Sequence, residues 1–84
     1  MTTVECSTAG DAAFLRDALG RIGGVTVDGS TGNTVGFSLG AGAPLSDVAT
    51  AINELSVLGY DNIVINGKAT SLSMFAIEEA VKGG

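Results

Sequence analysis

The stretch DAAFLRDALGRIGGVTVDGSTGNTVGFSL, residues 11–39, decides the fold. Its first part carries apolar side chains three and four positions apart, which predicts an amphipathic helix over residues 11–22. The side chains expected on the buried face of this helix are Phe14, Leu15, Ala18, Leu19 and Ile22. Two consecutive glycines, Gly23 and Gly24, then end the helix.

The rest of this stretch predicts a β-hairpin. Apolar and polar residues alternate over 25–27 and again over 35–39, and a glycine-containing turn over 28–33 separates the two strands. One face of the hairpin is expected to face the helices and carries Val25, Val27, Val35, Phe37 and Leu39. The opposite face is small and smooth, with Thr26, Thr34, Gly36 and Ser38.

The flanking residues add a strand before this unit and a helix and a strand after it. Residues 2–6 predict a short edge-type strand, and Thr8 stands three residues before Asp11, as in a capping box. Pro44 predicts the start of a second helix that ends at Gly59. Its apolar positions are Leu45, Val48, Ile52 and Leu55, and an apolar strand follows at 63–65.

Two alternatives remain open after Asn66–Gly67. This dipeptide is a hairpin signal and could return a strand through residues 68–72. Alternatively, Ser71 or Ser73 caps a helix, and Glu78–Ala80 favours this second possibility, so we expect a helix over 73–82. Gly83–Gly84 are expected to fray.

The order β-α-β-β-α-β predicts one α+β domain over residues 1–84, a ferredoxin-like two-layer sandwich with an additional C-terminal helix. A KH-like or ring-building β-α-β-β-α module is the closest alternative.

Several runs of this sequence resemble heavy-metal-associated domains. Residues 15–28 are similar to the first helix and second strand of that family, and residues 45–52 and 58–61 to its second helix and the turn into its fourth strand. The resemblance covers residues 4–65 and implies the ferredoxin-like fold. The family binds its metal through Cys-x-x-Cys at the start of the first helix, but the matching positions here are Thr8 and Asp11. The resemblance therefore supports the fold and argues against copper carrying.

Composition excludes several classes of function. The 84 residues include 4 Lys and Arg, 9 Asp and Glu, one Cys, and no His or Trp, for a net charge of −5. These counts exclude His-based catalysis, a His-dependent zinc site and an internal disulfide, and we expect no cofactor and no enzyme activity. Four cations cannot form a nucleic-acid footprint. We expect no nucleic-acid or membrane partner, and a location inside the cell or in an assembled particle, because no signal-peptide pattern opens the chain.

Several polar residues suggest reactive or metal-binding sites, but ordinary structural roles explain these residues better. Cys6 precedes a helix whose N-terminus could lower the thiol pKa, but no base or second thiol accompanies it, so we expect a packed cysteine. Asp28, Ser30 and Asn33 are expected to form a turn rather than a calcium loop. Lys68 is expected to be a solvated surface charge.

The remaining hypothesis is a non-catalytic protein-interaction or assembly module, a homo-oligomer or one component of a larger particle such as a phage structural or accessory protein. Only 15% of residues are charged, so the surface must be unusually neutral. Two interface areas are predicted: the small sheet face (Thr26, Thr34, Gly36, Ser38) and the last helix (Met74, Phe75, Ile77, Val81). Phe75 is expected to anchor the contact, unless it completes the core of the monomer.

The alternative function is a small-ligand-binding or regulatory domain. Gly40, Gly42 and Pro44 lie between a strand and a helix, the context in which a helix N-terminus binds an anion. This segment lacks the third glycine of a dinucleotide fingerprint and the Gly-Lys of a P-loop.

Overall fold

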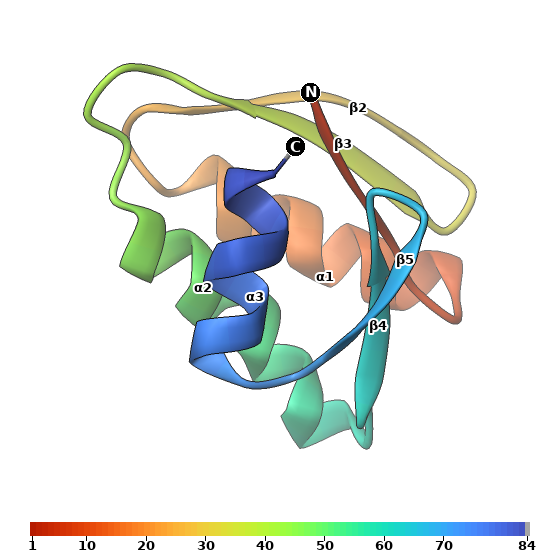
Figure 1. Cartoon of the computed structure of the whole chain (residues 1–84). Helices are drawn as coiled ribbons and strands as arrows, with labels where there is room; N and C mark the ends of the chain where they lie inside the picture. The colour runs from red at the N-terminus through yellow and green to blue at the C-terminus, as the bar shows by residue number, and fades with distance from the viewer. Residues whose placement is uncertain (84) are drawn as a thin grey trace.

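Within residues 1–83, five strands form one antiparallel sheet in the order β2-β3-β1-β4-β5, and three α-helices accompany it (Figure 1). The computed structural model describes residues 1–83, so Gly84, one of the two residues expected to fray, lies outside the described range. The elements are β1 (Thr2–Glu5), α1 (Ala9–Gly20), β2 (Val25–Thr31), β3 (Thr34–Leu39), α2 (Leu45–Asn53), the 3-10 helix η1 (Glu54–Leu58), β4 (Asn62–Ile65), β5 (Lys68–Ser71) and α3 (Met74–Lys82).

This topology confirms the predicted α+β class and is that of a ferredoxin-like sandwich. Apart from η1, the elements from β1 to β4 follow β-α-β-β-α-β, and β1 lies between β3 and β4 with antiparallel pairing on both sides. The predicted edge position of residues 2–6 is therefore wrong. Local sequence does not determine it, because a split β-α-β connection places the first strand in the middle of the sheet.

Both alternatives predicted after residue 66 occur, one after the other. Asn66 and Gly67 have φ values of 53° and 80° and form the tight turn into β5. Ser73 then caps α3, because its side chain accepts a hydrogen bond from the backbone N–H of Ala76 at 3.4 Å. A four-residue strand leaves enough chain for the helix, so the two predictions were compatible.

The hairpin of β2 and β3 turns later than predicted. Thr31 pairs with Thr34, so the turn is only Gly32–Asn33, and Gly32 has the left-handed φ of 61°. The pairing register shifts between Val27 and Gly29, which marks a β-bulge at Asp28. This bulge absorbs part of the segment predicted as a turn.

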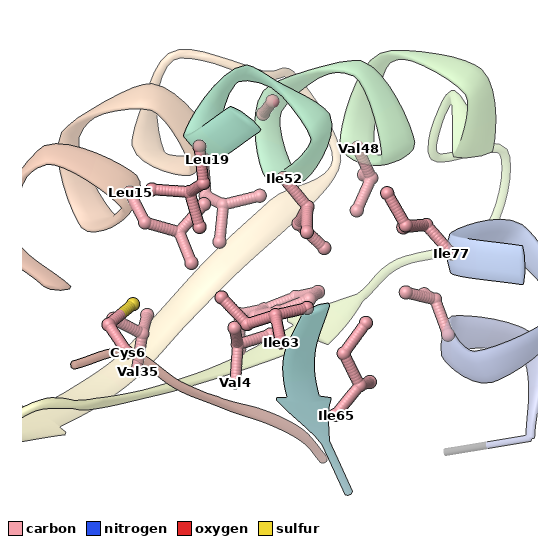
Figure 2. Packing of buried hydrophobic residues seen from close by; sticks show 14 of the residues in the cluster. Val4, Cys6, Leu15, Leu19, Val35, Val48, Ile52, Ile63, Ile65 and Ile77 are labelled. Carbon is pink, nitrogen blue, oxygen red and sulfur yellow. The ribbon is translucent and has the colours of Figure 1, made fainter. Parts of the chain in front are cut away.

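The core lies between the helices and one face of the sheet (Figure 2). Leu15, Leu19, Val48 and Ile52 point from α1 and α2 toward the strands, as predicted. Phe14 departs from the prediction and is 45% exposed, because the buried stripe of α1 runs through Ala12, Leu15 and Leu19 and Phe14 lies one residue off it. The buried cluster contains Val4, Cys6, Ala12, Leu15, Leu19, Val35, Phe37, Val48, Ala49, Ala51, Ile52, Leu55, Ile63, Ile65, Ile77 and Val81.

Candidate functional site

The first predicted interface, the small sheet face, faces away from the helices. On β2 and β3 it presents Thr26 opposite Ser38 and Gly29 opposite Gly36. Thr26 is exposed, whereas Ser38 is half-buried and its hydroxyl donates a hydrogen bond to the Asp28 carboxylate. Gly36 is buried, and a Cβ on it would lie 3.0 Å from the sulfur of Met1. Thr34, the fourth residue of this predicted interface, is also half-buried. Of the four residues, only Thr26 is therefore fully exposed to solvent.

Charge makes this face a poor surface for contact between two copies. Side chains alternate between the two faces of the sheet, so Glu5, which pairs with Thr34, lies on the small sheet face. The Asp28 carboxylate is held at the same face by the hydroxyl of Ser38. Along the paired strands of residues 1–83, no Lys or Arg occupies this face, because Lys68 lies opposite the buried Ile65 and shares its face of the sheet. Stacking two copies face to face would bring like charges together and desolvate hydroxyl groups.

The second predicted interface, the last helix, divides into a buried half and an exposed half. Ile77 is fully buried and Val81 is 2% exposed, so the structure corrects their assignment as interface residues and places them in the core. Phe75 is 77% exposed and Met74 is 37% exposed. Two helical positions correspond to about 200° of rotation, so burying Ile77 directs Phe75 to solvent. The alternative that Phe75 completes the core is therefore wrong.

Two further apolar side chains lie at the same end of the molecule as the start of α3. Val57 and Leu58 of η1 are 84% and 48% exposed. Asn53, the residue before η1, donates a side-chain hydrogen bond to the carbonyl of Leu72 at 3.0 Å, which holds the end of α2 to the segment that enters α3 (Figure 1). We call Val57, Leu58, Met74 and Phe75 the apolar end.

Val57 and Leu58 were missed because the helix period was extended past its end. Leu58 stands three residues after Leu55, and a continued α-helix would bury both. The chain tightens into η1 instead and stops at Gly59, whose φ is 95°. The available signal was the pair of adjacent apolar residues directly before a C-terminal glycine.

The predicted ligand loop links β3 to α2 and borders a shallow hollow. Gly40 donates its N–H to the carbonyl of Gly24 at 2.7 Å, and Gly42 has a φ of 79°. Pro44 precedes α2 and provides no side-chain cap. The hollow, of about 400 Å³, is lined by Gly40 and Gly42 with Lys82 as its one cationic side chain. Asp47 in the first turn of α2 adds a negative charge near this helix N-terminus.

The segment before α1, where the resembling family holds its metal, is a hydrogen-bonded clasp. Thr8 caps α1 by accepting from the N–H of Asp11 at 3.1 Å. The hydroxyl of Tyr60 donates to Asp11 Oδ2 at 2.5 Å and accepts from the N–H of Ser7 at 2.7 Å. Thr8 and Asp11 therefore have structural partners. Within residues 1–83, no three Cys, Asp or Glu side chains lie close enough together to hold a metal ion.

Cys6 is packed beside this clasp. It is 3% exposed, and burial raises the pKa of its thiol from 9.0 to about 11, with a smaller contribution from the charge of Asp11. The thiol is thus protonated at neutral pH, as expected for a packed cysteine, and the helix N-terminus does not lower its pKa.

The side chains of Asp28, Ser30 and Asn33, the polar residues of the predicted turn, do not converge on one point. Asp28 bonds to Ser38, Ser30 accepts a hydrogen bond from Arg16 at 3.2 Å, and the Asn33 side chain donates to the carbonyl of Cys6 at 2.5 Å. Three different partners separate the oxygens that a calcium ion would need.

Comparison with protein-family models, curated proteins and solved structures gives no match for this chain. Among residues 1–83, no helix combines the length and apolar character needed to cross a membrane. The functional interpretation therefore depends on the geometry alone.

Proposed function

We propose that this chain is a non-catalytic protein-interaction module that contacts its protein partner through the apolar end. The observation that carries this proposal is the 77% exposure of Phe75 at the start of α3, beside the partly exposed Met74, whereas Ile77 and Val81 farther along the same helix are buried. Exposed apolar clusters mark interaction surfaces, and aromatic residues contribute a large share of interface energy. With charge at only 15% of residues, little electrostatic repulsion protects such a surface from contact.

The absence of catalysis in this proposal is supported by the chemistry of the side chains. The sequence contains no His, and the single thiol, Cys6, is buried with a raised pKa. General acid–base catalysis and thiolate chemistry need groups that titrate near neutral pH and reach solvent.

Light scattering after size exclusion, over a range of concentrations, tests the proposal on the wild type, Phe75→Ala and Thr26→Ala. Phe75→Ala should weaken association and leave a folded monomer, whereas Thr26→Ala on the sheet face should behave as wild type. A wild type that stays monomeric at its highest soluble concentration and recovers no partner in a pull-down would remove the proposal. So would a Phe75→Ala variant with the association of the wild type.

A second candidate function, binding of a small anion, is favoured only by the hollow beside Gly40 and Lys82. Inorganic phosphate should then raise the unfolding temperature of the wild type and leave that of Lys82→Ala unchanged. Equal responses of the two proteins would exclude this function.

A further inference from the structure

Strand β5 forms an open edge of the sheet, and its hydrogen-bonding groups can be assigned individually. The N–H of Leu72 donates to the carbonyl of Asp61 at 3.1 Å, which makes these two residues a hydrogen-bonded pair in register with β4 and β5. Because such pairs alternate along an antiparallel ladder, Lys68 and Thr70 bond to β4, whereas Ala69 and Ser71 direct their backbone groups outward.

Three of these outward groups have no partner among residues 1–83. They are the N–H and C=O of Ala69 and the N–H of Ser71, whereas the carbonyl of Ser71 already accepts from the N–H of Ser73 at 2.9 Å. Exposed edge groups of this kind pair with another extended strand.

The opposite edge, β2, is blunted. It carries the bulge between Val27 and Gly29, with the Asp28 carboxylate at the bulge. β5 has neither a bulge nor a proline, and its one charge, on Lys68, lies at its first residue. Bulges and charges are the usual protection of an edge strand, so β5 is the edge that is open to pairing.

A groove runs between β5 and α3 and gives this edge an apolar wall. It has a volume of about 320 Å³ and is lined by Lys68, Ala69, Thr70, Ser71, Ala76, Glu79 and Ala80. The small side chains of Ala76 and Ala80 leave room for another chain.

We propose that β5 pairs antiparallel with β5 of a second copy of this chain, which joins the two sheets into one. The inference rests on the proposed function, because it names the partner as a second copy. Opposing Ala69 of each copy with Ser71 of the other satisfies all three free groups, since a carbonyl accepts two hydrogen bonds. The two-fold axis then passes between the two Thr70 residues.

Charge complementarity favours a second copy as the occupant. Within one chain Lys68 and Glu79 line the same groove without forming an ion pair, and the one ion pair in the described range is Arg16–Asp17. The two-fold arrangement carries Lys68 of each copy to Leu72 of the other, beside the start of α3 and the groove that contains Glu79. Each groove therefore receives the cation of the other copy, and its one carboxylate, Glu79, forms no ion pair within the described residues.

A four-residue strand provides a small interface, so we expect a dissociation constant of roughly 10–100 µM. The first test is amide hydrogen exchange of the full chain, measured by NMR below and above this range. The amides of Ala69 and Ser71 should gain protection as concentration rises. The amide of Ser30, which faces outward at the β2 edge, should not.

Substitutions provide the second test. Ala69→Pro removes an outward N–H without touching the bonds to β4, and it should weaken association at least about tenfold, whereas Ser30→Pro should not. If Ala69→Pro does not fold, charge exchange decides: Lys68→Glu and Glu79→Lys should each weaken association, and the double variant should restore it.

The outcomes separate this inference from the proposed function. Association that Phe75→Ala weakens but the β5 variants leave unchanged would overturn the β5 dimer and retain the interaction module. A monomeric wild type, or a double charge variant as weak as the single ones, would also overturn it. Weakening by the β5 variants without an effect of Phe75→Ala would support the dimer and remove the apolar end as the contact surface.

Discussion

Replacing Tyr60 with Phe removes a single oxygen that links Tyr60 to the start of α1. The hydroxyl donates to Asp11 Oδ2 at 2.5 Å and accepts from the N–H of Ser7 at 2.7 Å, while the ring packs against the core. The aromatic ring is retained in Tyr60→Phe, so the variant isolates the hydrogen bonds. The Asp11 acceptor and the Ser7 donor lie at the start of α1, and Tyr60 follows η1. The substitution therefore breaks the link between the start of α1 and the end of η1.

The expected loss in the free energy of unfolding follows from the two hydrogen bonds of the Tyr60 hydroxyl. A hydrogen bond to a charged group contributes about 1.5–3 kcal/mol, and the half-buried position of Tyr60 places the value at the low end. The N–H of Ser7 is exposed and finds water when the hydroxyl is lost, so its contribution is small. We expect a loss of about 1.5 kcal/mol, which for a domain of this size corresponds to roughly 6–12 °C in Tm.

A double-mutant cycle of Tyr60→Phe and Asp11→Asn, measured by urea denaturation, checks this value. Because the two side chains share one bond, the sum of the single effects should exceed the effect of the double variant by about 1 kcal/mol. Effects that add within about 0.3 kcal/mol would show that the two groups are not coupled and would refute the clasp.

The remaining predictions concern the core, the thiol and one turn. Leu19→Ala and Ile52→Ala each remove a fully buried side chain and should lower the free energy of unfolding by about 2–5 kcal/mol in equilibrium denaturation; wild-type midpoints would show that the helix phase is wrong. Since the pKa of Cys6 rises from 9.0 to about 11 on folding, the folded state keeps a proton that the unfolded chain releases, so stability is complete below pH 9.0 and falls toward pH 11. Denaturation midpoints across this range should fall less for Cys6→Ala than for the wild type, and parallel curves would contradict the assignment. Competition titration with Cu(I) should reveal no site tighter than that of a cysteine-containing peptide, and a tight one-to-one site lost in Cys6→Ser would contradict this. Asn66→Ala should unfold at lower temperature than Asn66→Gly, because glycine adopts the φ of 53° without strain, and the reverse order would show that strain there is negligible.

The elements that local pattern controls were predictable, and those that depend on tertiary partners were not. The spacing of Leu15 and Leu19, and of Val48 and Ile52, identified buried helix faces correctly. The position of β1 in the sheet was not predictable from residues 2–6 alone, because its neighbours β3 and β4 lie far along the chain. The bulge at Asp28 was hidden because it shows in a pairing register and not in one strand.

The candidate site was predictable in part. An apolar helix near the C-terminus was evident from the sequence, but its pattern alone did not separate Phe75, which is exposed, from Ile77, which is buried. That separation requires the direction from which the sheet and α2 approach α3. The β5 edge was equally hidden, since unpaired backbone groups carry no signal in the side chains.

The central position of β1 has a consequence for the order in which this chain can fold. Cys6 exchanges hydrogen bonds with Asn33, 27 positions away, and Thr3 with Asn66, 63 positions away. During synthesis, β1 has no neighbour until β3 has been made, and one of its edges stays open until β4 follows. β1 therefore lacks one or both of its neighbours until β4 has been made, near the end of the sheet's sequence.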